Sequence, residues 1–356
     1  MGTTGSQIHA ARVSQAELVR SRVREALHGH PGPVAVIDFP NHNNAGDSAI
    51  WLGEQAALRY LGVEIAYVAD RTSFLPERVR RAVGDGPVLM HGGGNFGDVW
   101  PDFQELRERV LTTLPSNPVI QLPQTITFEN VRNQDRVARV CRAHGGMTLL
   151  VRDHESLAIA RDVLEVPTHL CPDMAMALEG INLPVPPVVD VLWQARMDKE
   201  SDATEETIRT AIAQLRGSGT VELADWSLED RKTRWARQSL RILGRVTRYE
   251  QLAAVPVQDI QATPFTRFAG QRVAMACRLL SRGRVVVTDR LHGHILCTLM
   301  GIPHLLLDNN NGKVGNYFRV WNADTGLTEW AGDVESGVKQ ARALLAQLRE
   351  ESRTTR

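Results

Sequence analysis

The chain has 356 residues, of which 43% are hydrophobic and 23% are charged, a composition typical of a globular protein rather than a disordered or fibrous one. Lysine plus arginine and aspartate plus glutamate number 41 each, which excludes a general electrostatic attraction to nucleic acid. Any anion that the protein binds must therefore be held by a few well-placed basic side chains.

The cysteines are far apart in the chain, and no CxxC pair is present. A structural zinc site and a thioredoxin-like centre are therefore disfavoured, and buried reduced thiols are expected. The first fifteen residues lack the basic and apolar regions of a signal peptide, and no apolar run reaches the ~20 residues needed to cross a bilayer. These features predict a cytoplasmic protein. The cysteines are Cys141, Cys171, Cys277 and Cys297.

Strand-like and helix-like segments alternate from Pro33 onward. Short apolar runs, separated by amphipathic helical patterns, lie at residues 34–38, 63–68, 88–91, 119–122 and 147–151. Fully apolar strands between amphipathic helices are typical of a parallel sheet that is covered on both faces. We therefore predict an N-terminal extension over residues 1–32 and a Rossmann-like domain over residues 33–185.

A proline-rich stretch at residues 183–187 is the best candidate for a linker. A second α/β pattern follows it. The clearest strand of this pattern is at residues 285–288, a helix extends over about 291–300, and another strand lies at 304–307. The strand that runs directly into a helix at residue 291 makes this region a candidate ligand-binding edge.

We predict a second Rossmann-like domain over residues 186–333, and a C-terminal helix and tail over residues 334–356. The region 228–266 is harder to interpret, because it is basic, contains tryptophan and shows little strand pattern. The predicted fold class is α/β, with two Rossmann-type domains. Such a pair places a ligand cleft between the domains, at the carboxyl ends of the strands.

Two polar motifs follow strands of the first predicted domain. Asp47 ends the motif Asn-Ala-Gly-Asp and stands where a helix begins, so in isolation it would be an N-cap. The second motif, His-Gly-Gly-Gly-Asn-Phe-Gly-Asp, covers residues 91–98 and predicts a loop whose backbone N–H groups face an anion or a sugar. The predicted ligand-contacting residues of this loop are Gly92, Gly93, Gly94 and Asn95.

The glycines of residues 91–98 also match the dinucleotide pattern G-x-G-x-x-G. We reject a nicotinamide cofactor, because the motif follows the third strand rather than the first and no acidic residue ends the next strand. Asp98 would also repel a pyrophosphate at this position. No metal or cofactor is expected.

Arg152 lies at another predicted junction between a strand and a helix. An arginine at such an edge could clamp a carboxylate or a phosphate. Judged in isolation, it is about as well explained as a surface arginine that pairs with Asp153 or Glu155.

The strongest motif is Asp-Arg-Leu-His-Gly-His at residues 289–294, which joins a buried strand directly to a helix. Arg290 and His292 therefore stand near a helix N-terminus, where the helix dipole and the unsatisfied N–H groups favour an anion. His292 is a natural proton donor at such a site, whereas His294 is expected to pack or to support it. One strand later, a loop that ends at Lys313 supplies a further cation.

At these residues the sequence resembles the polysaccharide pyruvyl transferases, and among them the bacterial exopolysaccharide and biofilm-matrix enzymes. The motifs occur in the family's order over roughly residues 34–321, and they read NAGDSAI, GGGNFGD, VRDHES, CPDMA, DRLHGHI and DNNNGKVGNYFRVW. The resemblance implies a GT-B-like fold. It maps the family's Arg-Leu-His onto Arg290, Leu291 and His292 as the donor site, and the other basic donor ligand onto Arg152.

The resemblance also implies the reaction. Such an enzyme moves the enolpyruvyl group of phosphoenolpyruvate onto sugar hydroxyls of a polysaccharide, glycolipid or oligosaccharide precursor and forms a pyruvate ketal. Arg152, Arg290 and Lys313 could neutralise the phosphate and the carboxylate of this co-substrate without a metal. His292 is then the candidate acid. A lipid-linked acceptor would bring the enzyme to the inner face of a membrane.

Three questions stay open at this point. Asp47 and Asp98 are both candidates for the base that activates the acceptor. A metal-independent GT-B glycosyltransferase that uses a nucleotide sugar would share the fold, and a non-catalytic sugar- or anion-binding protein is a further alternative. The sequence does not identify the acceptor sugar, the stereochemistry of the ketal or the oligomeric state.

Overall fold

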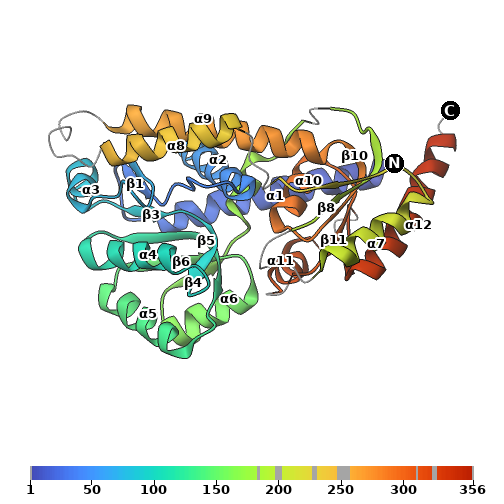
Figure 1. Cartoon of the computed structure of the whole chain (residues 1–356). Helices are drawn as coiled ribbons and strands as arrows, with labels where there is room; N and C mark the ends of the chain where they lie inside the picture. The colour runs from blue at the N-terminus through green and yellow to red at the C-terminus, as the bar shows by residue number, and fades with distance from the viewer. Residues whose placement is uncertain are drawn as a thin grey trace. The chain divides into compact units, whose positions relative to one another are not determined.

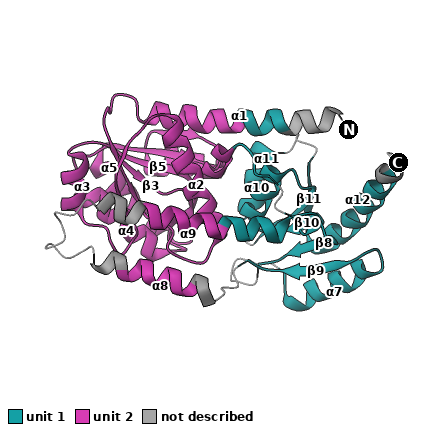
Figure 2. Cartoon of the chain, turned by 90° about the horizontal axis from the view of Figure 1, so that it is seen from above, with its two compact units in different colours: residues 1–14, 179–228, 273–356 teal, residues 15–178, 229–272 magenta. Residues whose placement is uncertain are grey.

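A computed structural model describes residues 2–182, 185–196, 203–226, 231–246, 257–309, 312–322 and 327–354. The protein is α/β, and all strand pairs that the structure describes are parallel, as the sequence predicts (Figure 1). The chain divides into two compact units (Figure 2). Unit 1 comprises residues 1–14, 179–228 and 273–356, and unit 2 comprises residues 15–178 and 229–272.

Unit 2 contains a seven-stranded sheet with the order β2-β1-β3-β5-β6-β7, and β4 pairs with β5 outside this path. The apolar runs of the sequence become buried strands because both faces of the sheet are covered; every residue of β1, for example, is buried. The strands are β1 (Val34–Ile37), β2 (Ile65–Ala69), β3 (Val88–Met90), β4 (Gly93–Gly97), β5 (Val119–Thr127), β6 (Met147–Val151) and β7 (Thr168–Leu170).

The helices of unit 2 begin and end at residues that favour helix boundaries. Asn44 caps α2, a proline opens α3 and another opens α4, and Gly145 ends α5 in the left-handed conformation. These helices are α2 (Ala45–Tyr60), α3 (Pro76–Val83), α4 (Pro101–Thr113), α5 (Val131–His144), α6 (His154–Ala158), the π-helical η1 (Ile159–Leu164), the 3-10 helix η2 (Met174–Leu178) and α8 (Arg231–Val246). Helices α1 (Gly2–Ala26) and α9 (Val257–Leu280) contribute residues to both units.

Unit 1 contains a five-stranded sheet with the order β12-β11-β10-β8-β9. Its core consists of side chains from the sheet and from α7 and α12, which pack against it. The strands are β8 (Val189–Gln194), β9 (Val221–Ala224), β10 (Gly283–Thr288), β11 (His304–Leu307) and β12 (Thr328–Gly332). The helices are α7 (Glu205–Arg216), α10 (Leu291–Met300), α11 (Lys313–Trp321) and α12 (Val334–Thr354).

The division into units groups the chain differently from the predicted boundaries at residues 32, 185 and 333. The region 229–272 belongs to unit 2. Its Phe265 ring stacks on Phe39 with centroids 3.9 Å apart, and Phe39 in turn packs edge-on against Trp51. This long-range aromatic cluster ties the start of α9 to α2 and to the end of β1. Helix α12 is grouped with unit 1.

Of the predicted linker 183–187, residues 183 and 184 lie outside the described residues, as do residues 228–230 and 247–256 of the region that was hard to interpret. All four cysteines are free and buried, which confirms the predicted reduced thiols. No helix in the described ranges is long and apolar enough to cross a membrane.

Candidate active site

The segment 289–294 is fixed to the end of β10 by a short hydrogen-bond chain. The hydroxyl of Thr288 accepts the Arg290 N–H at 3.0 Å and donates to the Gln194 side-chain oxygen at 2.8 Å. A Cβ at Gly293 would overlap both of these oxygens. The glycine therefore allows the first turn of α10 to pack directly against the ends of β8 and β10.

Arg290 is held in place as the N-cap residue of α10. Its Nη2 lies 2.8 Å from Oδ1 of Asp225, and its guanidinium lies 5.8 Å from the ring centre of Trp226. Both partners directly follow β9. The preceding Asp289 accepts the Arg196 N–H, and burial raises the pKa of this carboxyl to about 6 although Arg290 opposes the shift. The motif is thus rigidly attached to three strand ends.

His292 and Leu291 lie in the buried first turn of α10, and the buried side chain of His294 connects this helix to His304 of β11. Nδ1 of His294 lies 2.7 Å from Nε2 of His304, whose Nδ1 donates to the Ile302 carbonyl at 2.7 Å. Burial lowers the pKa of His294 to about 4 and that of His304 well below its usual value. Both imidazoles are therefore neutral, and they position the helix that carries His292.

Lys313 begins α11 after Gly312, which has the left-handed φ of 65°. Strands β10 and β11 are parallel neighbours, so the loops that carry Arg290 and Lys313 leave the same edge of one sheet. Unit 1 thus carries four of the predicted donor-site residues at that edge, which are Arg290, Leu291, His292 and Lys313. The predicted donor ligand Arg152 belongs to unit 2.

The Asn-Ala-Gly-Asp motif begins α2, but its capping residue differs from the expectation. The Asn44 side chain accepts the Gly46 N–H at 3.0 Å and donates to Asp47 at 2.8 Å, so Asn44 is the N-cap and Asp47 lies in the first turn. Nε2 of His42 lies 3.5 Å from the Asp47 carboxylate. A Cβ at Gly93 would lie 3.5 Å from Asp47 Oδ1. The structure therefore brings the first two motifs together.

The predicted glycine loop is in part a short parallel strand, and this corrects the sequence analysis. Residues 93–97 form β4, which pairs with the second half of β5. A Cβ at Gly97 would overlap the Thr127 carbonyl, so the glycines serve this close backbone pairing. The N–H of Gly92 donates to Glu54 at 2.9 Å and that of Asn95 to Gln124 at 3.2 Å. These two N–H groups have partners inside the unit.

Asn95 is also fixed through its side chain. The Gln124 amide and the Arg107 guanidinium both donate to Asn95 Oδ1 at 3.0 Å. Arg107 is fully buried, and it also donates to the amide oxygens of Gln104 and Gln121. A network of buried polar side chains therefore fixes β4 through the side chain of Asn95.

Arg152 is a buried residue and not a surface arginine. It is 1% exposed, its Nη1 lies 2.7 Å from Asp173 Oδ2, and its Nη2 donates to the Thr125 hydroxyl at 2.9 Å. The carboxylate of this pair comes from the Cys-Pro-Asp motif after β7, whereas Asp153 accepts the Ser156 N–H and caps α6. Sequence reasoning did not connect residues 152 and 173, because the pairing depends on the sheet order.

Asp98 acts as an anchor for the start of α5. Its carboxylate accepts the N–H groups of Glu129 at 2.7 Å and Asn130 at 3.0 Å, and the Asn133 side-chain amide at 3.0 Å. Burial raises the pKa of Asp98, but these three hydrogen bonds outweigh it and the net shift is downward. A carboxylate with a lowered pKa is a weak base.

Asp38 is a candidate site residue that the sequence analysis missed. It follows β1 with a left-handed φ of 78°, is 1% exposed, and neither carboxylate oxygen has a hydrogen-bond partner among the described residues. Burial raises its pKa to about 7, although His91 and Arg107 oppose the shift. The available signal was a charged residue at the end of an apolar strand, and residue 38 was instead counted within that strand.

His91 and Glu54 form a buried ion pair beside this carboxylate. Nδ1 of His91 lies 2.9 and 3.1 Å from the two oxygens of Glu54. Burial lowers the pKa of His91, but the charge of Glu54 and its hydrogen bond outweigh this, and the pKa rises to about 9. Strained backbone and shifted pKa values at a strand end are typical of functional sites.

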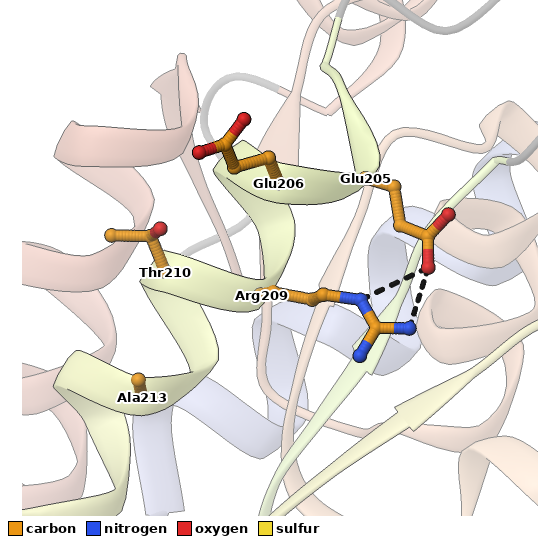
Figure 3. A pocket seen from close by; sticks show the side chains of 5 residues that line it. All are labelled: Glu205, Glu206, Arg209, Thr210 and Ala213. Atoms are coloured by element: carbon orange, nitrogen blue, oxygen red, sulfur yellow. Dashed lines mark hydrogen bonds and ion pairs between the residues drawn. The ribbon is translucent and has the colours of Figure 1, made fainter.

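An open hollow on α7 is a poor candidate for the anion site (Figure 3). Arg209 is the basic residue that lines this hollow, and its Nη2 already forms an ion pair with Oε1 of Glu205 at 2.6 Å. None of its lining residues carries a predicted role. They are Glu205, Glu206, Arg209, Thr210 and Ala213.

Parallel α/β units with arginine, histidine and aspartate side chains at the carboxyl ends of their strands define the class of ligand-binding α/β proteins. Comparison with known proteins specifies this class further. The family model for polysaccharide pyruvyl transferases matches residues 44–311. The chain belongs to this family, and the protein is a pyruvyl transferase, as the resemblance of its motifs predicts.

Two curated relatives support the assignment. The chain is 32% identical over 303 residues to pyruvyl transferase 1 of Schizosaccharomyces pombe, which covers 81% of this chain and 69% of the relative. It is 30% identical over 296 residues to EpsO of Bacillus subtilis, which is named as a pyruvyl transferase. This match covers 81% of this chain and 85% of EpsO. A crystal structure of an uncharacterized Klebsiella pneumoniae protein shares the fold at a TM-score of 0.55 and 15% identity, covering 88% of this chain and 97% of that one.

Proposed function

We propose that the protein transfers the enolpyruvyl group of phosphoenolpyruvate to two hydroxyls of a sugar in a glycan precursor and forms a pyruvate ketal. Membership of the family supports pyruvyl transfer. The observation that carries the choice of donor is the attachment of Arg290 and His292 to the start of α10, with Lys313 at the same sheet edge. Cations and a helix N-terminus suit a small molecule with a phosphate and a carboxylate.

In the proposed reaction, His292 donates a proton to the methylene carbon of phosphoenolpyruvate. A sugar hydroxyl attacks the resulting electron-poor carbon, inorganic phosphate leaves, and a second hydroxyl closes the ketal. Of the two hydroxyl protons, one restores His292 and the other leaves with phosphate. Arg290 and Lys313 stabilise the negative charge of the donor and of the leaving phosphate. In this proposal, side-chain cations supply the charge stabilisation, and His292 supplies the proton.

We propose Asp47 rather than Asp98 as the base that activates the acceptor. Asp47 lies beside His42 and Gly93, at the start of α2. Asp98 accepts three hydrogen bonds that lower its pKa, which reduces its basicity. For Arg152, a donor ligand would have to share the guanidinium with Asp173, so its donor role stays a prediction. The GT-B-like cleft stays a prediction as well.

The experiment combines donor binding with product formation. We expect phosphoenolpyruvate, and not nucleotide sugars, to raise the melting temperature of the protein. Incubation with phosphoenolpyruvate and candidate glycans should release phosphate and give the ketal, which mass spectrometry detects. We expect His292→Asn to lower the rates of phosphate release and of ketal formation by roughly a hundredfold or more. The matched control is His154→Asn, at an exposed histidine of α6.

Three results would contradict the proposal. Stabilisation by nucleotide sugars alone, with sugar transfer, would establish the glycosyltransferase alternative. Unchanged product formation by His292→Asn would remove the acid from the mechanism. Stabilisation by phosphoenolpyruvate without turnover of any glycan would favour an anion-binding protein.

A further inference from the structure

Helix α8 has an unusual distribution of charge for a protein without net charge. Over its 16 residues it contains six basic side chains and no acidic one, whereas basic and acidic residues balance in the whole chain. The basic residues are Arg231, Lys232, Arg234, Arg237, Arg241 and Arg245. The helix belongs to unit 2 (magenta in Figure 2). Its positive charge is therefore a local feature.

The same helix exposes two large apolar side chains. Trp235 is 63% exposed and Ile242 is 60% exposed, and because they are seven residues apart they lie on one face, two turns from each other. Arg234 and Arg241 are also exposed and have the same spacing. Leu240 is buried at 6% exposure and anchors the helix to the unit. The outer face thus presents an apolar pair beside an arginine pair.

We propose that the outer face of α8 docks the enzyme on an anionic lipid bilayer. Tryptophan and isoleucine at an exposed position gain free energy when they enter the boundary between headgroups and acyl chains. The neighbouring arginines can keep their guanidinium groups among anionic headgroups while their stems cover apolar surface. A second copy of this helix would bring like charges together, and an apolar pair has no role in binding a phosphate backbone.

The inner side of the helix places this surface close to the acceptor motif of the same unit. Burial is the main cause that lowers the pKa of His42, and Arg237 of α8 acts in the same direction through its charge. His42 lies 3.5 Å from Asp47, the proposed base. If the proposed function holds, docking through α8 would bring a lipid-linked glycan to the motif that activates its hydroxyls.

Vesicle flotation tests the docking without any need for activity. We expect the whole chain to float with vesicles of phosphatidylcholine and phosphatidylglycerol, to lose this binding as salt rises, and not to bind phosphatidylcholine alone. Trp235→Ser/Ile242→Ser should weaken binding at least about tenfold. Arg234→Gln/Arg241→Gln should weaken it by roughly thirtyfold, since each arginine near an anionic surface contributes about fivefold.

Matched controls come from exposed residues outside α8. Val131 is 69% exposed and Arg209 and Arg342 are exposed, so Val131→Ser and Arg209→Gln/Arg342→Gln should leave flotation unchanged. Equal binding to neutral and anionic vesicles, or unchanged binding by both α8 variants, would refute the proposal. So would a change from dimer to monomer in Trp235→Ser/Ile242→Ser, which would identify the face as a contact between copies.

A second readout separates docking from catalysis. With a water-soluble acceptor, the α8 variants should form the ketal at the rate of the unmodified enzyme. If no form of the enzyme makes a ketal although vesicle binding follows the expected pattern, the proposed function fails and the docking surface stands.

Discussion

In unit 1, the charged groups at the sheet edge have partners that fix their geometry. Arg290 pairs with Asp225, and Asp289 accepts the Arg196 N–H. In unit 2, by contrast, the Asp38 carboxylate is buried without a hydrogen-bond partner among the described residues. The side chains at the unit 1 edge are therefore preorganised, whereas the buried charge of Asp38 destabilises the folded state of unit 2. Proteins keep a destabilising buried charge mainly where function requires the group.

The largest loss of stability is expected from breaking the buried pair of unit 2. Glu54→Gln leaves His91 without its carboxylate, and we expect the free energy of unfolding to fall by about 3 kcal/mol at pH 7. Urea denaturation monitored by circular dichroism measures this change. Glu129→Gln, at an exposed glutamate, is the control. A loss no larger than that of the control would show that the pair is not part of the unit's stability.

Asp38→Asn should have the opposite sign. The pKa of Asp38 is raised in the folded protein to about 7, so the folded state loses stability as pH rises from about 4 to 7. Asparagine tolerates the left-handed backbone but has no charge. We therefore expect the variant to gain roughly 2 to 4 kcal/mol at pH 8 and little at pH 4. A gain that is equal at both values, or no gain at pH 8, would remove the asymmetry between the units.

Gly293→Ala tests how strictly the unit 1 edge is preorganised. The added Cβ would overlap the oxygens of Gln194 and Thr288, so the first turn of α10 must shift. We expect a loss of about 1 to 3 kcal/mol in unfolding free energy, together with weaker binding of phosphoenolpyruvate. Gly270→Ala meets open space and is the matched control. Wild-type stability and donor binding in Gly293→Ala would show that the edge adapts easily.

The smallest effect is expected at Asp98. Asp98→Asn weakens the hydrogen bonds at the start of α5 and should cost about 1 kcal/mol, with the turnover rate unchanged. Asp47→Asn should instead reduce turnover while leaving stability nearly unchanged. Melting temperatures and rates of phosphate release, measured on both variants, compare the two carboxylates. The reverse pattern would exchange their roles.

The sequence predicted the parallel sheets well, because their strands are short apolar runs between amphipathic helices. It also predicted the strand-to-helix junction at Arg290 and His292, which depends on adjacent residues. It did not predict β4, because three successive glycines are typical of a loop and only the pairing with β5 makes residues 93–97 extended.

The remaining differences all depend on contacts between distant parts of the chain. The ion pair between Arg152 and Asp173 follows from the neighbouring positions of β6 and β7. Residues 229–272 belong to unit 2, and the stacking of Phe265 on Phe39 is one of the long-range contacts that connect them to it. A local pattern contains neither pairing. Asp38 was missed for a related reason, because its burial and its raised pKa depend on side chains that are distant in the sequence, such as His91 and Arg107.

The neutral pair of His294 and His304 has a consequence for kinetics. Burial lowers the pKa of His294 to about 4 and that of His304 well below its usual value, so both rings stay neutral at neutral and alkaline pH. The support that these two rings give α10 therefore stays the same at neutral and alkaline pH. Asp289, which precedes Arg290 and has a pKa raised to about 6, is the group at the start of α10 that can add an acidic limb to a pH–rate profile.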